Sequence, residues 1–357
     1  MTIASLLLDW YATHGRDLPW RRDRGWYAVW ISEVMLQQTR VETVRRYYER
    51  WIEKFPTVEA LAAVELDKVL AFWEGLGYYR RAHFLHQAAR ILVAEHGGRL
   101  PRTVVELRRL PGIGRYTAAA IASIAFGADE LALDGNHRRV LSRLFDLELD
   151  PRSSSGERRL LEQALPILPK GRAGEFNQAL MDLGALLCIP RTPNCGACPL
   201  ASMCLAHRRG VEAERPLRRP RRTVPHHTVV AAVLRRGQEV LIARRAAGRL
   251  LGGLWEFPGG KLEAGESLAE CLRRELREEL AADAVPGAQL GVFRHGYTHF
   301  TVTVHALECA LQGAEPRALE HSQIRWTPIL RLTRFPMGKV DRAIANTLIA
   351  EASHRIT

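Results

Sequence analysis

Four of the six cysteines in this sequence lie close together and have the spacing of metal ligands. They occur as C-x6-C-x2-C-x5-C, at Cys188, Cys195, Cys198 and Cys204. Four thiolates within so short a segment suit either a zinc ion or an iron–sulfur cluster. Zinc sites usually use paired short knuckles, whereas this segment contains a single Cys-x2-Cys pair. The spacing therefore predicts a metal centre and leaves both metals open.

A carboxyl group in the stretch WISEVMLQQTRV has the surroundings of a proton donor. Apolar residues bracket Glu33 on both sides, and the run predicts a helix that is largely apolar. Removing a carboxyl group from water raises its pKa, and a carboxyl that stays protonated near neutral pH can serve as a general acid. The alternative is a solvated glutamate on the polar side of the helix.

Two glycine-containing turns could bring backbone or carboxylate groups to the start of a helix. In LPGIGRYTAAA, Gly112 and Gly114 flank Ile113 just before a helix, so backbone N–H groups could face a phosphate there. A purely structural turn between two helices is equally compatible with this stretch. In LALDGNHRRVLSR, Asp134 precedes a glycine and a basic helix, a position that by itself favours a helix N-cap.

Glutamates gather in the segment LWEFPGGKLEAGESLAECLRRELREEL, residues 254–280. A serine followed three residues later by a glutamate predicts that a helix starts at Ser267. With about 100° per residue, four leucines define an apolar arc, and Glu275, Glu278 and Glu279 lie near its edge. Carboxylates so close to a core face repel one another unless a cation neutralises them, which favours a divalent metal. A solvated helix with Arg–Glu pairs is the alternative.

These groups must be positioned by two different kinds of structure. Residues 1–207 read as successive helices with apolar residues three and four apart, which predicts an all-α region. Residues 208–225 are rich in arginine and poor in apolar residues, which predicts an interdomain linker. Residues 226–357 show strand-like alternation interrupted by one helix and closed by another, which predicts an α+β domain.

The formal net charge of +12 and the isoelectric point near 9.9 favour an anionic partner, with nucleic acid first. The alternative is a solubility effect of an arginine-rich surface. No run of 18 apolar residues occurs and the N-terminus lacks the pattern of a signal peptide, so no membrane partner is expected. The expected location is the cytoplasm, in association with the nucleoid.

Residues 10–207 resemble the endonuclease III superfamily of DNA glycosylases, with the motifs in the superfamily's order. LPGIGRYTAAA is similar to its helix-hairpin-helix, and the cysteine spacing is similar to its 4Fe–4S loop. SEVMLQQT, GLGYYRRAHFLH and FNQALMDLGALLC resemble the MutY family of adenine glycosylases. The resemblance implies a 4Fe–4S cofactor, a six-helix part at about 20–125, and an iron–sulfur part formed by 1–19 and 126–207.

By this resemblance, the chain removes adenine mispaired with 8-oxoguanine or guanine from duplex DNA by hydrolysing the N-glycosidic bond. Glu33 would protonate the base and Asp134 would stabilise the sugar cation, with Asn136 assisting at the sugar or the water. Bifunctional relatives carry a lysine where this chain has Tyr116, and a phenol cannot form a Schiff base. We therefore expect a monofunctional, monomeric glycosylase in which Tyr116 positions Asp134 or the nucleophile.

The same resemblance implies a set of residues that contact DNA. Those expected at the adenine are Gln178 and either Arg21 or Trp20, and those expected to wedge into the gap beside the lesion are Gln38 and Tyr78. The two hairpin glycines would face phosphates. For Trp20 and Tyr78, a place among the core aromatic residues is the alternative.

The glutamate-rich segment fits the Nudix box, and the α+β domain resembles MutT-like Nudix domains, in which Glu320 would be a further metal ligand. The box would end on glycine, where this chain has Ala281. The MutY family uses such a domain to recognise 8-oxoguanine through an aromatic–hydroxyl–imidazole loop, here Tyr297, Thr298 and His299. The main role implied is lesion recognition. A Mg²⁺ site with additional pyrophosphatase activity is the less favoured interpretation.

Overall fold

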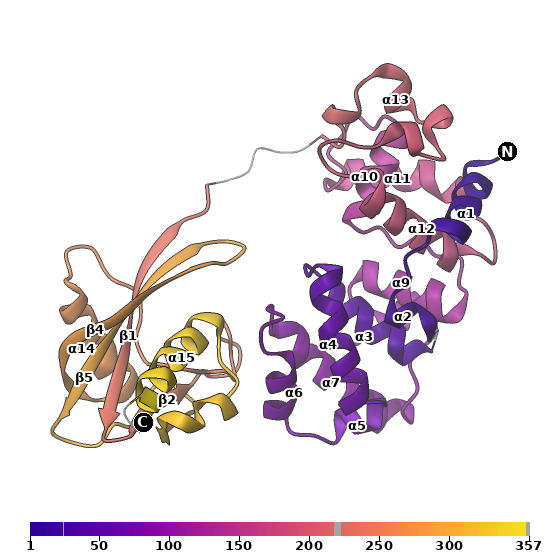
Figure 1. Cartoon of the computed structure of the whole chain (residues 1–357). Helices are drawn as coiled ribbons and strands as arrows, with labels where there is room; N and C mark the ends of the chain where they lie inside the picture. The colour runs from indigo at the N-terminus through magenta and orange to yellow at the C-terminus, as the bar shows by residue number, and fades with distance from the viewer. Residues whose placement is uncertain (24, 218–222, 355–357) are drawn as a thin grey trace. The chain divides into compact units, whose positions relative to one another are not determined.

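The computed structural model describes residues 1–23, 25–217 and 223–354 of the chain. Its contacts separate two compact units. The first unit comprises Met1–Ala63 and Phe84–Arg221, and the second comprises Val64–His83 and Arg222–Thr357. Figure 1 shows the whole chain, coloured from the N-terminus to the C-terminus. Within the described residues, no helix is long and apolar enough to cross a membrane.

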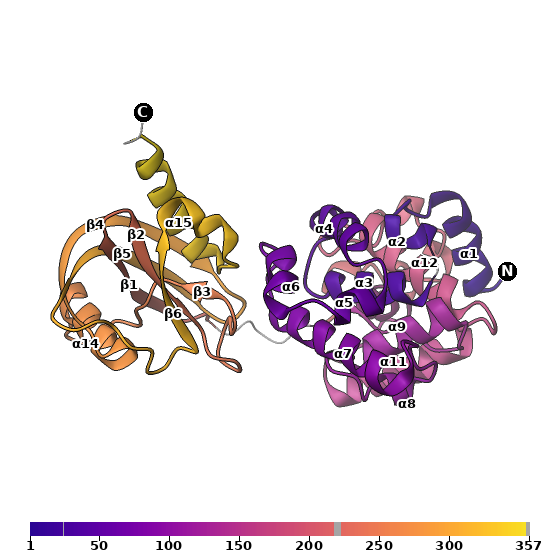
Figure 2. The ribbon, with the colours of Figure 1, turned by 90° about the horizontal axis from the view of Figure 1, so that it is seen from below.

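The first unit is helical, as the sequence predicts (Figure 2). Helix α7 (Arg80–His96) begins in the second unit and continues into the first. The other α-helices are α1 (Ile3–His14), α2 (Pro19–Arg22), α3 (Trp26–Leu36), α4 (Val41–Lys54), α5 (Val58–Ala62), α8 (Val104–Leu107), α9 (Arg115–Phe126), α10 (Gly135–Leu144), α11 (Ser154–Ala164), α12 (Ala173–Leu186) and α13 (Leu205–Arg209). Short 3₁₀ turns lie between them.

Helices that are far apart in the sequence pack together around the predicted catalytic residues. Helix α3 is buried along residues 28–35, as expected for a helix that is apolar on nearly every side. It packs against α9, and α9 packs against α12. Helix α12 in turn contacts α1 and α10 around a core of leucines. Glu33, Tyr116, Asp134 and Gln178 therefore come from elements that are linked by packing.

The helix predicted for the stretch WISEVMLQQTRV ends before the stretch does, and a second helix follows. Helix α3 ends at Leu36 and α4 begins at Val41. Between them, Gln38 has φ of 58°, a left-handed conformation that interrupts the helical hydrogen bonding. This turn leaves Gln38 exposed, as a residue that wedges into DNA must be.

In its described residues, the second unit is built on a mixed sheet of six strands. The strand order is β3-β2-β1-β5-β4, with β6 paired to β2, and β1 runs parallel to β5 while the other pairs are antiparallel. The strands are β1 (His226–Arg236), β2 (Glu239–Arg244), β3 (Trp255–Glu256), β4 (Asp283–Gly296), β5 (Thr301–Gln312) and β6 (Gln323–Pro328). This confirms the predicted α+β domain.

A helix covers each face of this sheet, because alternate residues of a strand point to opposite sides. Val233 of β1 belongs to the core that contains Ile344 of α15 (Lys339–His354). The next residue, Leu234, belongs to the core that contains Leu272 of α14 (Leu268–Leu280). Helix α14 starts where the sequence predicts, with both hydrogen bonds of a capping box at Ser267.

The second unit also includes residues 64–83, which hold helix α6 (Leu66–Trp73). The Oε1 atom of Glu74 accepts from Nε of Arg342 at 2.5 Å. The hydroxyl of Tyr79 donates to the carbonyl oxygen of Met337 at 3.2 Å. We expected this segment to belong with the six-helix part, and the structure groups it differently. These contacts join residues that are far apart in the sequence, so composition could not reveal them.

The predicted linker, 208–225, is partly folded. Residues 208–217 continue from α13 into a 3₁₀ turn, and Arg215 is buried in the first unit. Its Nε lies 2.7 Å from Oδ1 of Asp146, so the buried carboxylate obtains a cationic partner from this segment. The part of the linker at 218–222 lies outside the described residues.

Candidate active site

Glu33 is a buried acid on helix α3, with 4% of its surface exposed. Burial raises its pKa from 4.5 to about 7, because a carboxylate loses its hydration there. The hydrogen bond from Tyr116 and the charge of Arg21 lower this pKa, whereas the charge of Asp134 raises it. Glu33 therefore holds a proton up to about neutral pH, which suits a general acid.

Tyr116 on α9 lies beside this acid. Its hydroxyl donates to Oε2 of Glu33 at 2.6 Å. Burial and the charges of Glu33 and Asp134 raise its pKa well above its ordinary value, so the phenol remains protonated. We expected Tyr116 to position Asp134 or the nucleophile, but its hydrogen bond goes to Glu33. The charge of Asp134 nevertheless contributes, with that of Glu33, to the raised pKa of Tyr116.

Asp134 is the N-cap of α10. The helix-capping role that the sequence favoured for this residue is therefore confirmed. Its Oδ1 accepts from the backbone N–H of His137 at 2.7 Å and lies 2.7 Å from Nδ1 of the same residue. Burial alone would raise its pKa, but the hydrogen bonds and charge of His137 outweigh burial and lower it. Asp134 is therefore ionised under conditions in which Glu33 is protonated.

A chain of hydrogen bonds connects Asp134 with the backbone of the cysteine segment. Asn136 donates from Nδ2 to Oδ2 of Asp134 at 3.2 Å. Its Oδ1 accepts from Nη2 of Arg139 at 2.8 Å, and Nε of Arg139 donates to the carbonyl oxygen of Cys188 at 2.8 Å. The predicted assistant residue Asn136 therefore contacts the aspartate directly.

Residues that sequence reasoning missed hold the predicted adenine-binding residues. Arg21 makes two hydrogen bonds to the buried carboxylate of Asp182, at 2.7 and 2.9 Å. Arg16 donates to the same carboxylate from its backbone and from Nε, both at 2.8 Å. Gln178 accepts from the hydroxyl of Tyr11 at 2.7 Å. Gln178 and Asp182 are four residues apart on α12, and this spacing was the available signal.

The other predicted DNA contacts of the first unit differ in exposure. Trp20 is buried and meets the ring of Tyr48 edge-on, with centroids 5.4 Å apart, so it lies among the core aromatic residues. Gly112 has φ of 77°, and a Cβ there would lie 2.8 Å from Cβ of Phe84. Gly114 is the N-cap of α9, and nothing lies within 4 Å of its Cβ position. The helix start thus has the open backbone of a phosphate site.

All four cysteines of the predicted metal centre line one pocket. None of the cysteines in the described residues forms a disulfide. Burial, followed by the charges of neighbouring groups, raises the pKa of Cys195 and of Cys198 to about 11. Thiols so close together ionise readily only when a metal takes up their charge. The residues present therefore fit a centre with four thiolate ligands.

Arg143, His207 and Glu212 are among the other residues that line this pocket, and sequence reasoning missed them. Arg143 donates from Nη1 to Sγ of Cys188 at 3.3 Å. His207 Nδ1 lies 2.5 Å from Oε1 of Glu212. Ligand atoms of these two residues and Sγ of Cys195 all lie within 4.8 Å of one another. The only sequence signal for them was a histidine and a glutamate shortly after the last cysteine.

The predicted lesion-reading loop lies in the second unit, in the turn between β4 and β5. Tyr297 is half-buried and stacks on Phe300, with centroids 4.7 Å apart. Thr298 and His299 are exposed. Tyr78 has 44% of its surface exposed. Its hydroxyl lies 2.6 Å from Oγ1 of Thr298. Two residues assigned separately to lesion contact therefore meet within this unit.

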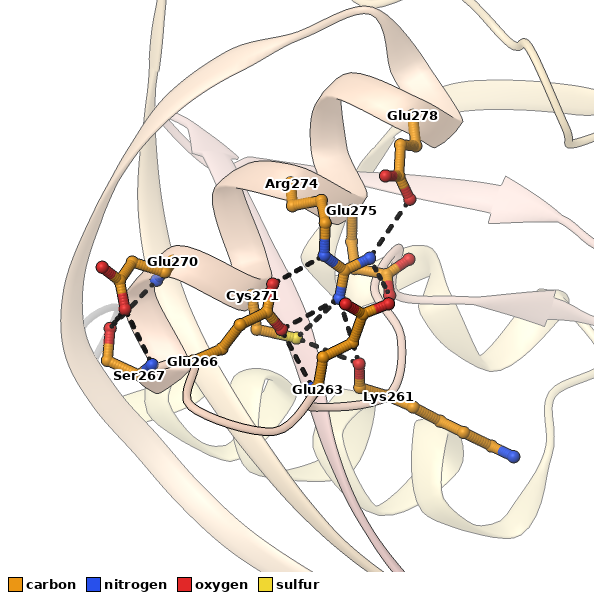
Figure 3. Close-up of polar contacts among 9 residues, drawn as sticks. All are labelled: Lys261, Glu263, Glu266, Ser267, Glu270, Cys271, Arg274, Glu275 and Glu278. Atoms are coloured by element: carbon orange, nitrogen blue, oxygen red, sulfur yellow. Dashed lines mark hydrogen bonds and ion pairs between the residues drawn. The ribbon is translucent and has the colours of Figure 1, made fainter.

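Figure 3 shows that Arg274 lies among the glutamates of the Nudix-like segment. Its guanidinium binds Glu266 at 2.7 Å, Glu275 at 2.9 Å and Glu278 at 3.1 Å. Glu279 instead accepts from the backbone N–H of Gly259 at 3.0 Å, and burial raises its pKa to about 7. Arg274 thus supplies the positive charge that we expected a metal ion to supply. Repulsion among these carboxylates is therefore no longer an argument for a bound metal.

Glu320 does not join this group of carboxylates. Its Oε2 pairs with Nη2 of Arg249 at 3.2 Å, and both side chains are exposed. Among the described residues, Glu275, Glu278, Glu279 and Glu320 form no set of three ligand atoms within 4.8 Å of one another. These residues therefore do not fit a preformed divalent metal site.

Three family models match successive parts of the chain. Residues 31–166 match the HhH-GPD superfamily of base excision DNA repair proteins, and 188–204 match the iron–sulfur binding domain of endonuclease III. Residues 229–347 match the NUDIX domain. With the buried acid, the helix-capping aspartate and the four-cysteine pocket, these matches define a base excision DNA glycosylase with an iron–sulfur domain and a C-terminal Nudix domain.

Individual relatives narrow this class. Adenine DNA glycosylase of Rattus norvegicus is 36% identical, covering 98% of this chain and 78% of its own length. That of Homo sapiens is 37% identical, covering 90% of this chain and 69% of its own length. The structure of a thermostable thymine-DNA glycosylase is 31% identical with a TM-score of 0.54, covering 58% of this chain and 95% of its own. The chain belongs to the adenine DNA glycosylase family.

Several sequence-based expectations are confirmed by these matches. The chain is a DNA N-glycosylase of base excision repair that acts on adenine. It binds an iron–sulfur cluster of the endonuclease III type, and the matched segment contains all four clustered cysteines. Its partner is duplex DNA, as for the endonuclease III–DNA complex that is 25% identical with a TM-score of 0.50, covering 58% of this chain and 94% of that one.

Proposed function

We propose that this glycosylase removes adenine opposite 8-oxoguanine or guanine, and that it does so without cutting the strand. The observation that carries the mechanism is the pair of carboxyl groups with opposite pKa shifts. Burial raises the pKa of Glu33 to about 7, whereas the partners of Asp134 lower its pKa. Such a pair divides the work between an acid and a stabilising carboxylate, as in glycosidases.

The reaction starts when the adenine leaves the base stack, because its glycosidic bond cannot be reached inside the duplex. Glu33 donates its proton to N7 of the adenine, which makes the base a better leaving group. Asp134 remains ionised and stabilises the positive charge that develops on the sugar. In this proposal Asn136, which donates to Asp134, assists at the sugar or the water.

The remaining assigned residues hold the two ends of the mispair. Arg21, fixed by Asp182, and Gln178, fixed by Tyr11, bind the extruded adenine in this proposal. Gln38 and Tyr78 enter the gap that the adenine leaves. The cluster, when bound, ties its four thiolates together and so fixes the segment that carries them.

We assign lesion recognition to Tyr297, Thr298 and His299. The hydrogen bond between Tyr78 and Thr298 supports this assignment, because it joins the expected wedge to the expected reading loop. The Nudix-like helix α14 then serves as a scaffold, since Arg274 already pairs with three of its carboxylates. In this proposal the protein acts as a monomer on nucleoid DNA in the cytoplasm.

Base release on three duplexes tests the proposed substrate. The duplexes carry adenine opposite 8-oxoguanine, guanine or thymine, and abasic sites are revealed by alkaline strand scission. The expected order of rates is the order just given, with the thymine duplex nearly inert. Equal rates on all three would refute the assigned specificity. Scission without alkali, or a near-stoichiometric adduct trapped by borohydride, would refute the monofunctional mechanism.

A further inference from the structure

The residue that binds Asp134 most closely is a histidine that the mechanism above does not use. His137 follows Asp134 by three residues, so its backbone N–H is the ordinary donor to an N-cap side chain. Its ring turns back to the same carboxylate, so that Oδ1 of Asp134 has two partners from one residue, each at 2.7 Å. A helix cap needs only the first of these hydrogen bonds.

The ring of His137 is enclosed by protein. The residue is fully buried, and within the described residues its Nε2 has no hydrogen-bond partner. An ionised carboxylate only accepts hydrogen bonds, so Nδ1 must carry a proton to bind Oδ1. The aspartate is therefore the single polar partner of this ring in the part of the chain that the structure describes. Because the ring is buried and has one polar contact, it can fix the orientation of the carboxylate that it binds.

We propose that His137 is a positioning residue for the glycosylase reaction: its Nδ1–H holds Oδ1 of Asp134, so that the carboxylate meets the sugar ionised and in a fixed orientation. The proposal rests on the role proposed above for Asp134. Asn136 holds the other oxygen at 3.2 Å, a longer hydrogen bond, so the histidine dominates the geometry. The hydrogen bond and charge of His137 also lower the pKa of Asp134 after burial raises it.

Other titratable and charged groups act on the same carboxylate, and His137 differs from each of them. Glu33 and Tyr116 face Asp134 from α3 and α9, and the charge of Glu33 opposes ionisation of its neighbour. Arg139 reaches Asp134 only through Asn136. Arg21, from α2, acts on Glu33 and is held by Asp182 of α12. His137 is thus the residue whose ring binds Oδ1 of Asp134 directly.

Two amide substitutions separate positioning from simple filling of space. In His137→Asn, the amide nitrogen occupies about the place of Nδ1 and can still donate to Asp134. In His137→Gln, the amide lies one bond further out, about where Nε2 is, and the contact is lost. Both variants keep the backbone N–H that caps the helix. Ser142→Ala is the control, because Ser142 is buried on the same helix and does not contact Asp134.

The readout is single-turnover base release as a function of pH, on a duplex with adenine opposite 8-oxoguanine. We expect His137→Gln to lose about tenfold or more in rate, as for one lost hydrogen bond to a charged group. Its acidic limb should move to higher pH, because Asp134 loses an interaction that favours the carboxylate. His137→Asn and Ser142→Ala should keep the rate within a few-fold of the parent rate. Their acidic limbs should lie at the same pH as that of the parent protein.

Two results would overturn the positioning role. One is a parent-like pH profile for His137→Gln, and the other is equal loss in the Asn and Gln variants with no movement of the acidic limb. Asp134→Asn distinguishes this failure from failure of the mechanism itself. If Asp134→Asn is inactive while His137→Gln is normal, only the histidine inference fails. If Asp134→Asn remains active, the role assigned to the aspartate fails with it.

Discussion

At the scale of single residues, the site consists of two buried carboxyl groups whose pKa values are shifted in opposite directions, because the partners of Asp134 outweigh the effect of burial. Glu33 sits among apolar residues and has one hydrogen-bond donor, whereas Asp134 caps a helix and receives three. The sequence predicted the desolvation of Glu33, because its neighbours along the helix are apolar. It did not predict that Tyr116 binds Glu33 or that Asp182 holds Arg21. These contacts join residues more than eighty positions apart, and no local pattern encodes them.

Tyr116→Phe tests the coupling between the phenol and the acid. The hydrogen bond from Tyr116 lowers the pKa of Glu33, so its removal should raise that pKa further. In the proposed mechanism activity needs protonated Glu33 and falls as pH rises through about 7, so the alkaline limb of base release should move to higher pH in the variant.

Tyr27→Phe is the matched control for this experiment, because Tyr27 lies on helix α3 with Glu33 but its hydroxyl donates to the carbonyl oxygen of Phe55. It should leave the pH profile unchanged. An alkaline limb that stays in place or moves to lower pH in Tyr116→Phe would show that the phenol does not tune Glu33.

At the scale of elements, the site depends on where helices start and stop. The capping box of α14 and the glycine turn before α9 follow local rules, so the sequence predicted both. The break between α3 and α4 was harder to predict, because the left-handed residue in that turn is a glutamine rather than a glycine. The partly folded linker was missed for a different reason. Its arginines have the composition of a solvated segment, and the sequence does not reveal that Arg215 pairs with the buried Asp146.

The two hairpin glycines should respond differently to alanine. Gly112→Ala forces a side chain into left-handed backbone and places Cβ 2.8 Å from Phe84, so we expect a loss of about 1–3 kcal/mol in stability. Gly114→Ala has open space and an ordinary φ of −82°, and it should be close to neutral in stability. Thermal unfolding and duplex-binding measurements on both variants check this.

If the hairpin carries phosphate contacts, Gly112→Ala should also weaken DNA binding, and the salt dependence of binding should become less steep. Gly114→Ala, which we expect to keep the stability of the parent protein, is the internal reference. Equal DNA affinity and equal melting temperature for the two variants would contradict the role given to this turn.

At the scale of the whole molecule, a Nudix domain and a DNA glycosylase region occur in one chain. The sequence predicted the fold, the box and the lesion-reading loop, but it could not decide whether the box binds metal. The structure supplies Arg274 as the counter-charge and leaves Glu320 apart. It also assigns residues 64–83 to the second unit, which places Tyr78 against Thr298.

Full-length protein incubated with Mg²⁺ and 8-oxo-dGTP should show no pyrophosphatase turnover. The carboxylates that would bind the metal pair with Arg274 or with the backbone at Gly259. Release of pyrophosphate or monophosphate is measured alongside the Glu278→Gln variant. Turnover that disappears in Glu278→Gln would establish a second active site and contradict the scaffold role.

Thr298→Ala should lower the preference for 8-oxoguanine over guanine. Loss of one hydrogen bond is worth about 1 kcal/mol, so we expect a change of about five- to tenfold in the ratio of the two base-release rates. The rate on the guanine duplex should change little. Thr303→Ala, on the adjoining strand β5, is the control. An unchanged ratio in Thr298→Ala would show that this loop does not read the lesion.

In the proposed mechanism, Glu33 supplies the proton that releases adenine. Single-turnover base release from a duplex with adenine opposite 8-oxoguanine tests it most directly, with Glu33→Gln compared to the parent at equal DNA occupancy. Loss of a general acid costs about 10²- to 10⁴-fold, and the residual rate should lose its decline above about pH 7. A Glu33→Gln variant that releases adenine within a few-fold of the parent rate would contradict the account.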